Sequence, residues 1–224
     1  MKYGNPPTDL GAVDVALDEV MYYLYLPIKL AGQQMMAMPD ALQPLWPMMD
    51  VVVRDLVKQD RYTDHYIYVT VKKMFVGGGV TANRPGWHAD GFGTDDLNYI
   101  WYDCVPTLFN TSEFTITEDD HVKSLVEYAE QALPQNDVVY PCGHVLRLDP
   151  SVVHRVAEVE EQVMRTFVKI SVSKDKYNLK DNSINRLLDY DWKKYDRATV
   201  RNDPNHAQRD SYTESHNPVD DHLI

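Results

Sequence analysis

Apolar residues recur every three or four positions in two stretches near the start of the chain. The first runs from Val13 to Leu24 and predicts an amphipathic helix that Pro27 ends. The second runs from Trp46 to Val57 and predicts another helix, ending near Lys58. Both are expected to pack on a sheet, because each has only one apolar face.

From Tyr66 the pattern becomes that of strands. Residues Tyr66–Val76 are rich in β-branched and aromatic side chains and stop at three consecutive glycines. One helix is predicted at His121–Leu133. Further short strand-like runs lie between Gly, Pro and Asp turns: Leu97–Val105, Phe114–Thr117, Val138–Tyr140, Val145–Leu148 and Thr166–Val172. Several short strands with such turns are typical of a β-sandwich or barrel.

The 224 residues are enough for one domain. We expect N-terminal helices at 1–60 packed on a barrel, the barrel itself at 61–174, and an extension at 175–224. The extension is polar and has almost no apolar residues beyond Val200. The predicted fold class is therefore mainly β with flanking helices.

Charge and cysteine content narrow the classes of function. The net charge is −12 and no Lys/Arg run occurs, which argues against binding of extended nucleic acid. Cys104 and Cys142 form no C-x-x-C pair, which favours a reducing compartment without disulfides. The most apolar stretch, 21–38, is interrupted by Pro, Lys and Gln, so no bilayer span is expected. We predict a cytoplasmic protein.

The segment His88-Ala89-Asp90 carries the first chemical signal. In an extended chain, residues two apart point to the same side, so an imidazole and a carboxylate would face one point. A histidine from another strand would complete the two-histidine, one-carboxylate set that holds non-haem Fe(II) and leaves positions open. The spacing of Asp95 and Asp96 from His88 does not favour joint chelation, and both are interpreted as loop acids.

The context of this pair makes the signal more specific. After a Gly turn and an alternating apolar strand, an Asp149-Pro150 turn leads to His154, which opens the next strand. Arg165 follows eleven residues later on a further strand.

In this order the chain resembles the Fe(II)/2-oxoglutarate-dependent dioxygenase superfamily, whose signature is His-x-Asp, a distal His and a basic residue beyond it. The resemblance covers roughly residues 66–173. It implies a jelly-roll barrel (a double-stranded β-helix, cupin-like) in which His88, Asp90 and His154 bind Fe(II). Arg165 would bind the distal carboxylate of 2-oxoglutarate through two parallel hydrogen bonds. The implied reaction uses O2, releases succinate and CO2, and normally hydroxylates a substrate.

Two features of the cosubstrate site stay open. Phe167 stands where many members have a Ser or Thr, and Lys169, on the same strand face, is an alternative to Arg165. A second partner for the carboxylate could be any of four residues on the expected facing strands: Tyr68, Thr70, Asn98 and Tyr99.

The substrate is expected to be a small molecule, a nucleotide or a protein side chain, and the oligomeric state is left open. Arg84, Trp101 and Tyr102 could line its cavity or could serve packing and turns. Five further histidines are interpreted without a role as ligands. His144 is taken as structural, His121 as a surface residue at a helix start, and His206, His216 and His222 as solvated residues of the tail. Two rival functions are a cupin-like barrel that binds metal or a small ligand without oxidation, and a degenerate barrel serving as a binding module.

Overall fold

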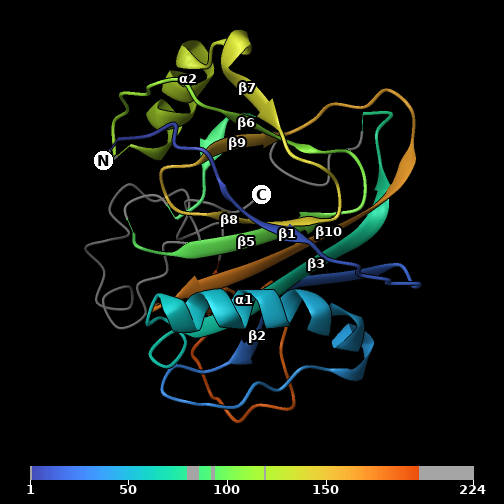
Figure 1. Cartoon of the computed structure of the whole chain (residues 1–224). Helices are drawn as coiled ribbons and strands as arrows, with labels where there is room; N and C mark the ends of the chain where they lie inside the picture. Colours follow the sequence, from blue (N-terminus) through green and yellow to red (C-terminus); the bar gives the residue numbers. More distant parts are fainter. Residues whose placement is uncertain (1, 80–85, 92–93, 119, 197–224) are drawn as a thin grey trace.

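Two β-sheets face each other in the computed structural model, which describes residues 2–79, 86–91, 94–118 and 120–196 (Figure 1). The strands are β1 (Thr8–Ala12), β2 (Met21–Lys29), β3 (Tyr66–Val76), β4 (His88–Ala89), β5 (Leu97–Tyr102), β6 (Thr107–Asn110), β7 (Asp137–Val139), β8 (His144–Leu148), β9 (Val153–Val156) and β10 (Val163–Ser173). The helices are η1 (Asp40–Leu45), α1 (Trp46–Lys58), α2 (His121–Gln131) and η2 (Pro134–Asn136).

The order of the strands identifies the fold. The large sheet runs β1-β8-β5-β10-β3-β2 and the small sheet runs β4-β9-β6-β7, with antiparallel pairing between the strands of each. From β3 to β10 the chain passes back and forth between the two sheets. These eight strands form a double-stranded β-helix, or jelly roll, and β1 and β2 extend its large sheet. The predicted fold class is confirmed.

The predicted helix at Val13–Leu24 is wrong, because residues 13–20 form neither helix nor strand and Met21–Leu24 already belong to β2. β2 is an edge strand that pairs with β3 over most of its length, and two register shifts interrupt the pairing around Tyr23 and Pro27. An edge strand tolerates a proline at a bulge, since the missing N–H breaks no central ladder. The helical spacing of a few apolar residues was outweighed by the aromatic and branched residues of Met21–Lys29, which pair with β3.

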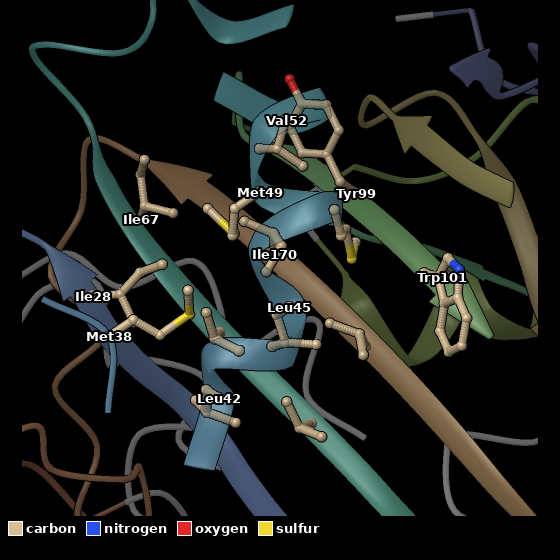
Figure 2. Close-up of a cluster of buried hydrophobic side chains, with 14 of the residues drawn as sticks. Ile28, Met38, Leu42, Leu45, Met49, Val52, Ile67, Tyr99, Trp101 and Ile170 are labelled. Carbon is tan, nitrogen blue, oxygen red and sulfur yellow. The ribbon is translucent and has the colours of Figure 1, made fainter. Parts of the chain in front are cut away.

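α1 and η1 cover the outer face of the large sheet, as Figure 2 shows. The helix places Met49 and Val52 on the sheet, and η1 adds Leu42 and Leu45, all of them fully buried. Their partners include Ile170 of β10, whose odd-numbered neighbours point to the opposite, inner face. The α1 prediction is confirmed, and this core leaves the inner face of β10 available for polar chemistry.

Replacing Leu45 with alanine should lower the free energy of unfolding by about 2–5 kcal/mol, because a fully buried side chain leaves a cavity. Urea unfolding of the variant would measure the change. Leu187, with an exposed fraction of 61%, provides the matched control, and Leu187→Ala should change stability little. Equal losses in the two variants would contradict the packing described for η1.

A second core fills the space between the two sheets at one end of the barrel. It joins Tyr102, Leu146 and Phe167 of the large sheet to Phe109 of the small one. α2 packs outside the small sheet, where its Tyr128 contacts a cluster containing Ala89 and Val153.

The predicted strand at Phe114–Thr117 is wrong, since only an isolated bridge pairs Phe114 with Tyr3. The strand β6 was not predicted.

Residues 175–196 of the polar extension lie against the barrel. The backbone N–H of Ser183 donates to the carbonyl of Leu24, and the Asn185 side chain donates to the carbonyls of Pro27 and Ala37. These contacts cover the outer edge of β2, which would otherwise offer unpaired backbone groups. Within the part of the chain that is described, no helix has the length and apolar character needed to cross a membrane.

Candidate metal centre

The pairing of β4 with β9 brings two histidines face to face. His88 lies directly opposite His154 in the register, and their ring centres are 4.5 Å apart. Asp90 follows β4 immediately, and its Oδ2 lies 3.8 Å from Nε2 of His154. One donor atom from each of the three residues lies within 4.8 Å of the others, and all three side chains are buried. The structure thus brings together the three residues that the sequence motif singled out.

Backbone carbonyls fix the orientation of both imidazoles. Nδ1 of His88 lies 2.7 Å from the carbonyl oxygen of Gly86, and Nδ1 of His154 lies 3.1 Å from that of Val152. A carbonyl only accepts hydrogen bonds, so each Nδ1 carries a proton, and in the neutral ring Nε2 then keeps its lone pair. This is the arrangement that metal-binding histidines usually have. The sequence could not reveal these partners, because they are backbone atoms two residues away.

These three donors fit a divalent transition metal. Two neutral imidazoles and one carboxylate on one side of a site form the facial set typical of non-haem Fe(II), which leaves further positions for small ligands. The site therefore has the chemistry of a metal centre with open positions.

Arg165 lies on the inner face of β10 and has an exposed fraction of only 1%. Its Nε–H donates to the carbonyls of Cys104 and Val105, at 3.1 and 3.0 Å. Its two terminal nitrogens are buried and have no hydrogen-bond partner among the described residues. Burial lowers the pKa of Arg165 to about 10, which still leaves it charged at neutral pH. A buried guanidinium with both ends unpaired is suited to receive a carboxylate.

A scan with protein-family models and a search of curated protein sequences find no match for this chain. Among solved structures, the chain is similar to EvdO2 from Micromonospora carbonacea var. aurantiaca complexed with 2-oxoglutarate, with 14% identity and a TM-score of 0.33 over 66% of this chain and 71% of that one. It is similar to an oxidoreductase of the 2OG-Fe(II) oxygenase family from Burkholderia pseudomallei, with 14% identity and a TM-score of 0.32 over 81% and 76%. A cupin protein from Bacteroides fragilis matches with 13% identity and a TM-score of 0.27 over 53% and 78%. What this site can do follows from its own residues.

Lys169 was the alternative to Arg165 as the residue that binds the cosubstrate carboxylate. Its ammonium lies beside Asp90. Its Nζ is 3.1 Å from Oδ2 of Asp90 and donates to the hydroxyl of Tyr25 at 2.9 Å. Burial by itself would lower the pKa of Lys169, but Asp90 and Tyr25 together raise it above its usual value. Lys169 is therefore a charged partner of the proposed metal ligand.

The four candidates for a second cosubstrate partner have other contacts in this structure. Tyr99 points to the opposite face of the sheet, where its hydroxyl donates to Asp55, so this candidate is wrong. The remaining three face inward but are bonded to protein groups: Tyr68 to the Asp175 carbonyl, Thr70 to the backbone N–H of Tyr25, and Asn98 to the Ser171 hydroxyl. A second partner therefore stays unassigned.

Of the candidate cavity residues, Trp101 is excluded and Tyr102 is retained. Trp101 lies in the core beneath α1, and its indole N–H donates to the carbonyl of Val13. Tyr102 faces inward, with its ring 5.8 Å from the guanidinium of Arg165. Arg84 lies outside the described residues, as do the three tail histidines. His144 is away from the centre and bonds to Asp9 of β1, as expected for a structural residue.

The two acids that follow the motif have separate contacts. Asp95 forms ion pairs with Arg61 and Lys174. Asp96 is buried and accepts a hydrogen bond of 2.8 Å from the hydroxyl of Tyr177. Neither belongs to the group of donors, in agreement with their interpretation as loop acids. Tyr177 itself had no signal in the sequence, since it lies in the polar extension.

The raised pKa of buried Asp96 leads us to expect that the stability of the fold depends on pH. Burial raises its pKa from 3.8 to about 6, although hydrogen bonds from Ser173 and Tyr177 oppose the shift. The folded chain thus keeps a proton that the unfolded chain loses, so this contribution to stability is complete below about pH 4 and lost as the pH rises through about 6. Asp96→Asn should therefore gain stability relative to the wild type between pH 4 and 7, by on the order of 2–3 kcal/mol. Urea unfolding at several pH values tests this, and parallel profiles would contradict it.

Proposed function

We propose that this chain is a Fe(II)- and 2-oxoglutarate-dependent dioxygenase that hydroxylates a substrate not yet identified. The observation that carries the proposal is the pairing of two features inside one barrel. His88, Asp90 and His154 converge within reach of a single ion, and neither terminal nitrogen of the buried Arg165 guanidinium has a hydrogen-bond partner in the part of the chain that the structure describes. A metal site alone would fit many functions, but a metal site with a buried carboxylate receptor fits an α-keto diacid cosubstrate.

Each residue has a defined part in this proposal. His88 and His154 would bind Fe(II) through Nε2, since each Nδ1–H donates to a carbonyl. Asp90 would supply the carboxylate, and Arg165 would bind and orient the distal carboxylate of 2-oxoglutarate. When bound, the iron and cosubstrate supply the oxidising chemistry, with release of succinate and CO2. The protein's contribution is to orient both and to keep water from the buried site.

The substrate is proposed to be a small molecule, a free nucleotide or a protein side chain. The net charge of −12 supports this range over an extended nucleic acid, because phosphates are repelled by an acidic surface. Of the two candidate cavity residues that the structure describes, Tyr102 faces the interior near Arg165, and it is proposed to form part of the wall of the cavity.

The decisive experiment measures succinate formed from 2-oxoglutarate by pure protein supplied with Fe(II) and O2. Succinate above the protein-free background, abolished by a chelator and by removal of O2, would support the proposal. A search for a mass increase of one oxygen in metabolite, nucleoside and peptide pools would then identify the substrate. Metal binding without any succinate would instead support the cupin-like binding barrel.

A further inference from the structure

Asp90 has a cationic partner that the proposed reaction does not use. Nζ of Lys169 lies 3.1 Å from Oδ2 of Asp90, the same oxygen that lies 3.8 Å from Nε2 of His154. Both members of this pair are buried, with exposed fractions of 9% and 5%. A hydrogen bond from an ammonium restricts the rotation of a carboxylate, so Lys169 determines where the oxygens of Asp90 lie.

Lys169 is itself fixed from two sides. β10 places it on the inner face between two neighbouring strands, opposite Thr70 of β3 and Ile100 of β5. Its ammonium also donates to the hydroxyl of Tyr25 at 2.9 Å. A flexible lysine side chain held at both its stem and its tip behaves as a rigid support.

Tyr25 adopts an unusual backbone conformation at this position. Its φ is +45°, in the left-handed region that a bulky side chain rarely adopts. The backbone N–H of Tyr25 donates to Oγ1 of Thr70 at 3.0 Å, which ties this residue to β3. Strained residues persist where their surroundings determine them and are concentrated at functional sites. Tyr25 combines this conformation with a hydroxyl that accepts a hydrogen bond from Lys169.

The C-terminal extension completes this support. The ring of Tyr177 packs edge-on against Tyr25 at 5.2 Å and stacks on Tyr68 at 4.2 Å, while its hydroxyl donates to Asp96. Tyr25, Tyr177, Lys169 and Asp90 help to enclose a cavity of about 10 Å³, room for about one water molecule. Lys169 therefore has little space in which to move away from Asp90.

We propose that Lys169, supported by Tyr25 and Tyr177, is a positioning residue that orients Asp90 for metal binding. The inference rests on the proposed function, because it requires a metal at the three donors. It also gives residues 175–196 a role, because Tyr177 lies in this segment and packs against Tyr25.

Co(II) binding, followed by its visible absorption bands, tests the inference without any turnover. Lys169→Met removes the ammonium and keeps an unbranched side chain of similar length. Co(II) affinity should fall about 10–100-fold, the usual loss when an outer partner of a metal ligand is removed, and the bands should change because the carboxylate is no longer held. Tyr25→Phe keeps the ring against Tyr177 and should give a smaller loss in the same direction.

Arg147→Met provides the matched control. Arg147 also pairs with a largely buried aspartate, Asp55, but on the outer face of the large sheet. It should lower stability while leaving Co(II) affinity and bands unchanged, which separates a site effect from a general loss of stability. Tyr25→Phe keeps the question answerable if Lys169→Met fails to fold.

The outcomes separate this inference from the proposed function. Unchanged or tighter Co(II) binding by both variants would overturn the role of Lys169 while leaving the metal site intact. Failure of the wild-type protein to bind Co(II) or Fe(II) would remove the metal site, and with it both proposals.

Discussion

Substituting His154 with alanine is expected to abolish metal binding and, with it, the conversion of 2-oxoglutarate to succinate. Loss of an outer partner of a ligand costs about 10–100-fold in metal affinity or activity, so loss of a ligand itself should cost more than about 100-fold. His154 is buried on β9, and its Nε2 faces the other donors. The two remaining donors would hold a labile divalent ion much more weakly than three do. Isothermal titration with Fe(II) without oxygen, together with a succinate assay, measures both effects.

His144→Ala is the control for this experiment. It removes a histidine of the neighbouring strand β8 whose Nδ1 bonds to Asp9, away from the three donors. This variant should bind metal and form succinate as the wild type does. If His154→Ala kept wild-type metal affinity, the assignment of the centre to these three residues would be wrong.

Replacing Arg165 with methionine is expected to weaken 2-oxoglutarate binding by more than about 100-fold while leaving metal affinity unchanged. A hydrogen bond to a charged group contributes about 1.5–3 kcal/mol, and two such bonds to one carboxylate would be lost. Methionine removes the guanidinium that lies over the Phe167 ring but keeps an unbranched side chain in the same place, so the fold should persist. Titration of 2-oxoglutarate into the metal-loaded protein gives the dissociation constant, and Co(II) titration gives the metal affinity.

The two readouts distinguish the possible roles of the inner cations. A loss of cosubstrate affinity alone supports Arg165 as the receptor of the distal carboxylate. An unchanged requirement for 2-oxoglutarate in Arg165→Met would transfer that role to Lys169, the other cation on the inner face of β10. A fall in both affinities would mean that Arg165 acts on the whole barrel.

The sequence predicted the core of the site because its signal is local. His88 and Asp90 are two residues apart, and the strands around them alternate in a regular way, so residue spacing alone placed the side chains on one face. The strands β3, β8 and β10 were also predicted, because each is a strand-like run within one short stretch of sequence. Arg165 was singled out by the family resemblance, and it lies on the inner face of β10 in the sheet that faces β9.

What the sequence did not predict depends on contacts between distant segments. The strand character of Met21–Lys29 was hidden because its partner is β3, and helical spacing nearby suggested a different element. The approach of Lys169 to Asp90 depends on the packing of Tyr25, which has a rare backbone conformation. Tyr177 lies in a polar segment, and only the folded structure shows that it packs beside the site.

The direct opposition of His88 and His154 links assembly of the metal site to folding. A shift of one residue between β4 and β9 would turn one imidazole to the other face of the sheet. An unfolded or misregistered chain therefore lacks the site, and any metal bound by the native chain alone shifts the folding equilibrium towards it. With iron as the proposed metal, the folded fraction of the protein would then rise with the concentration of free iron.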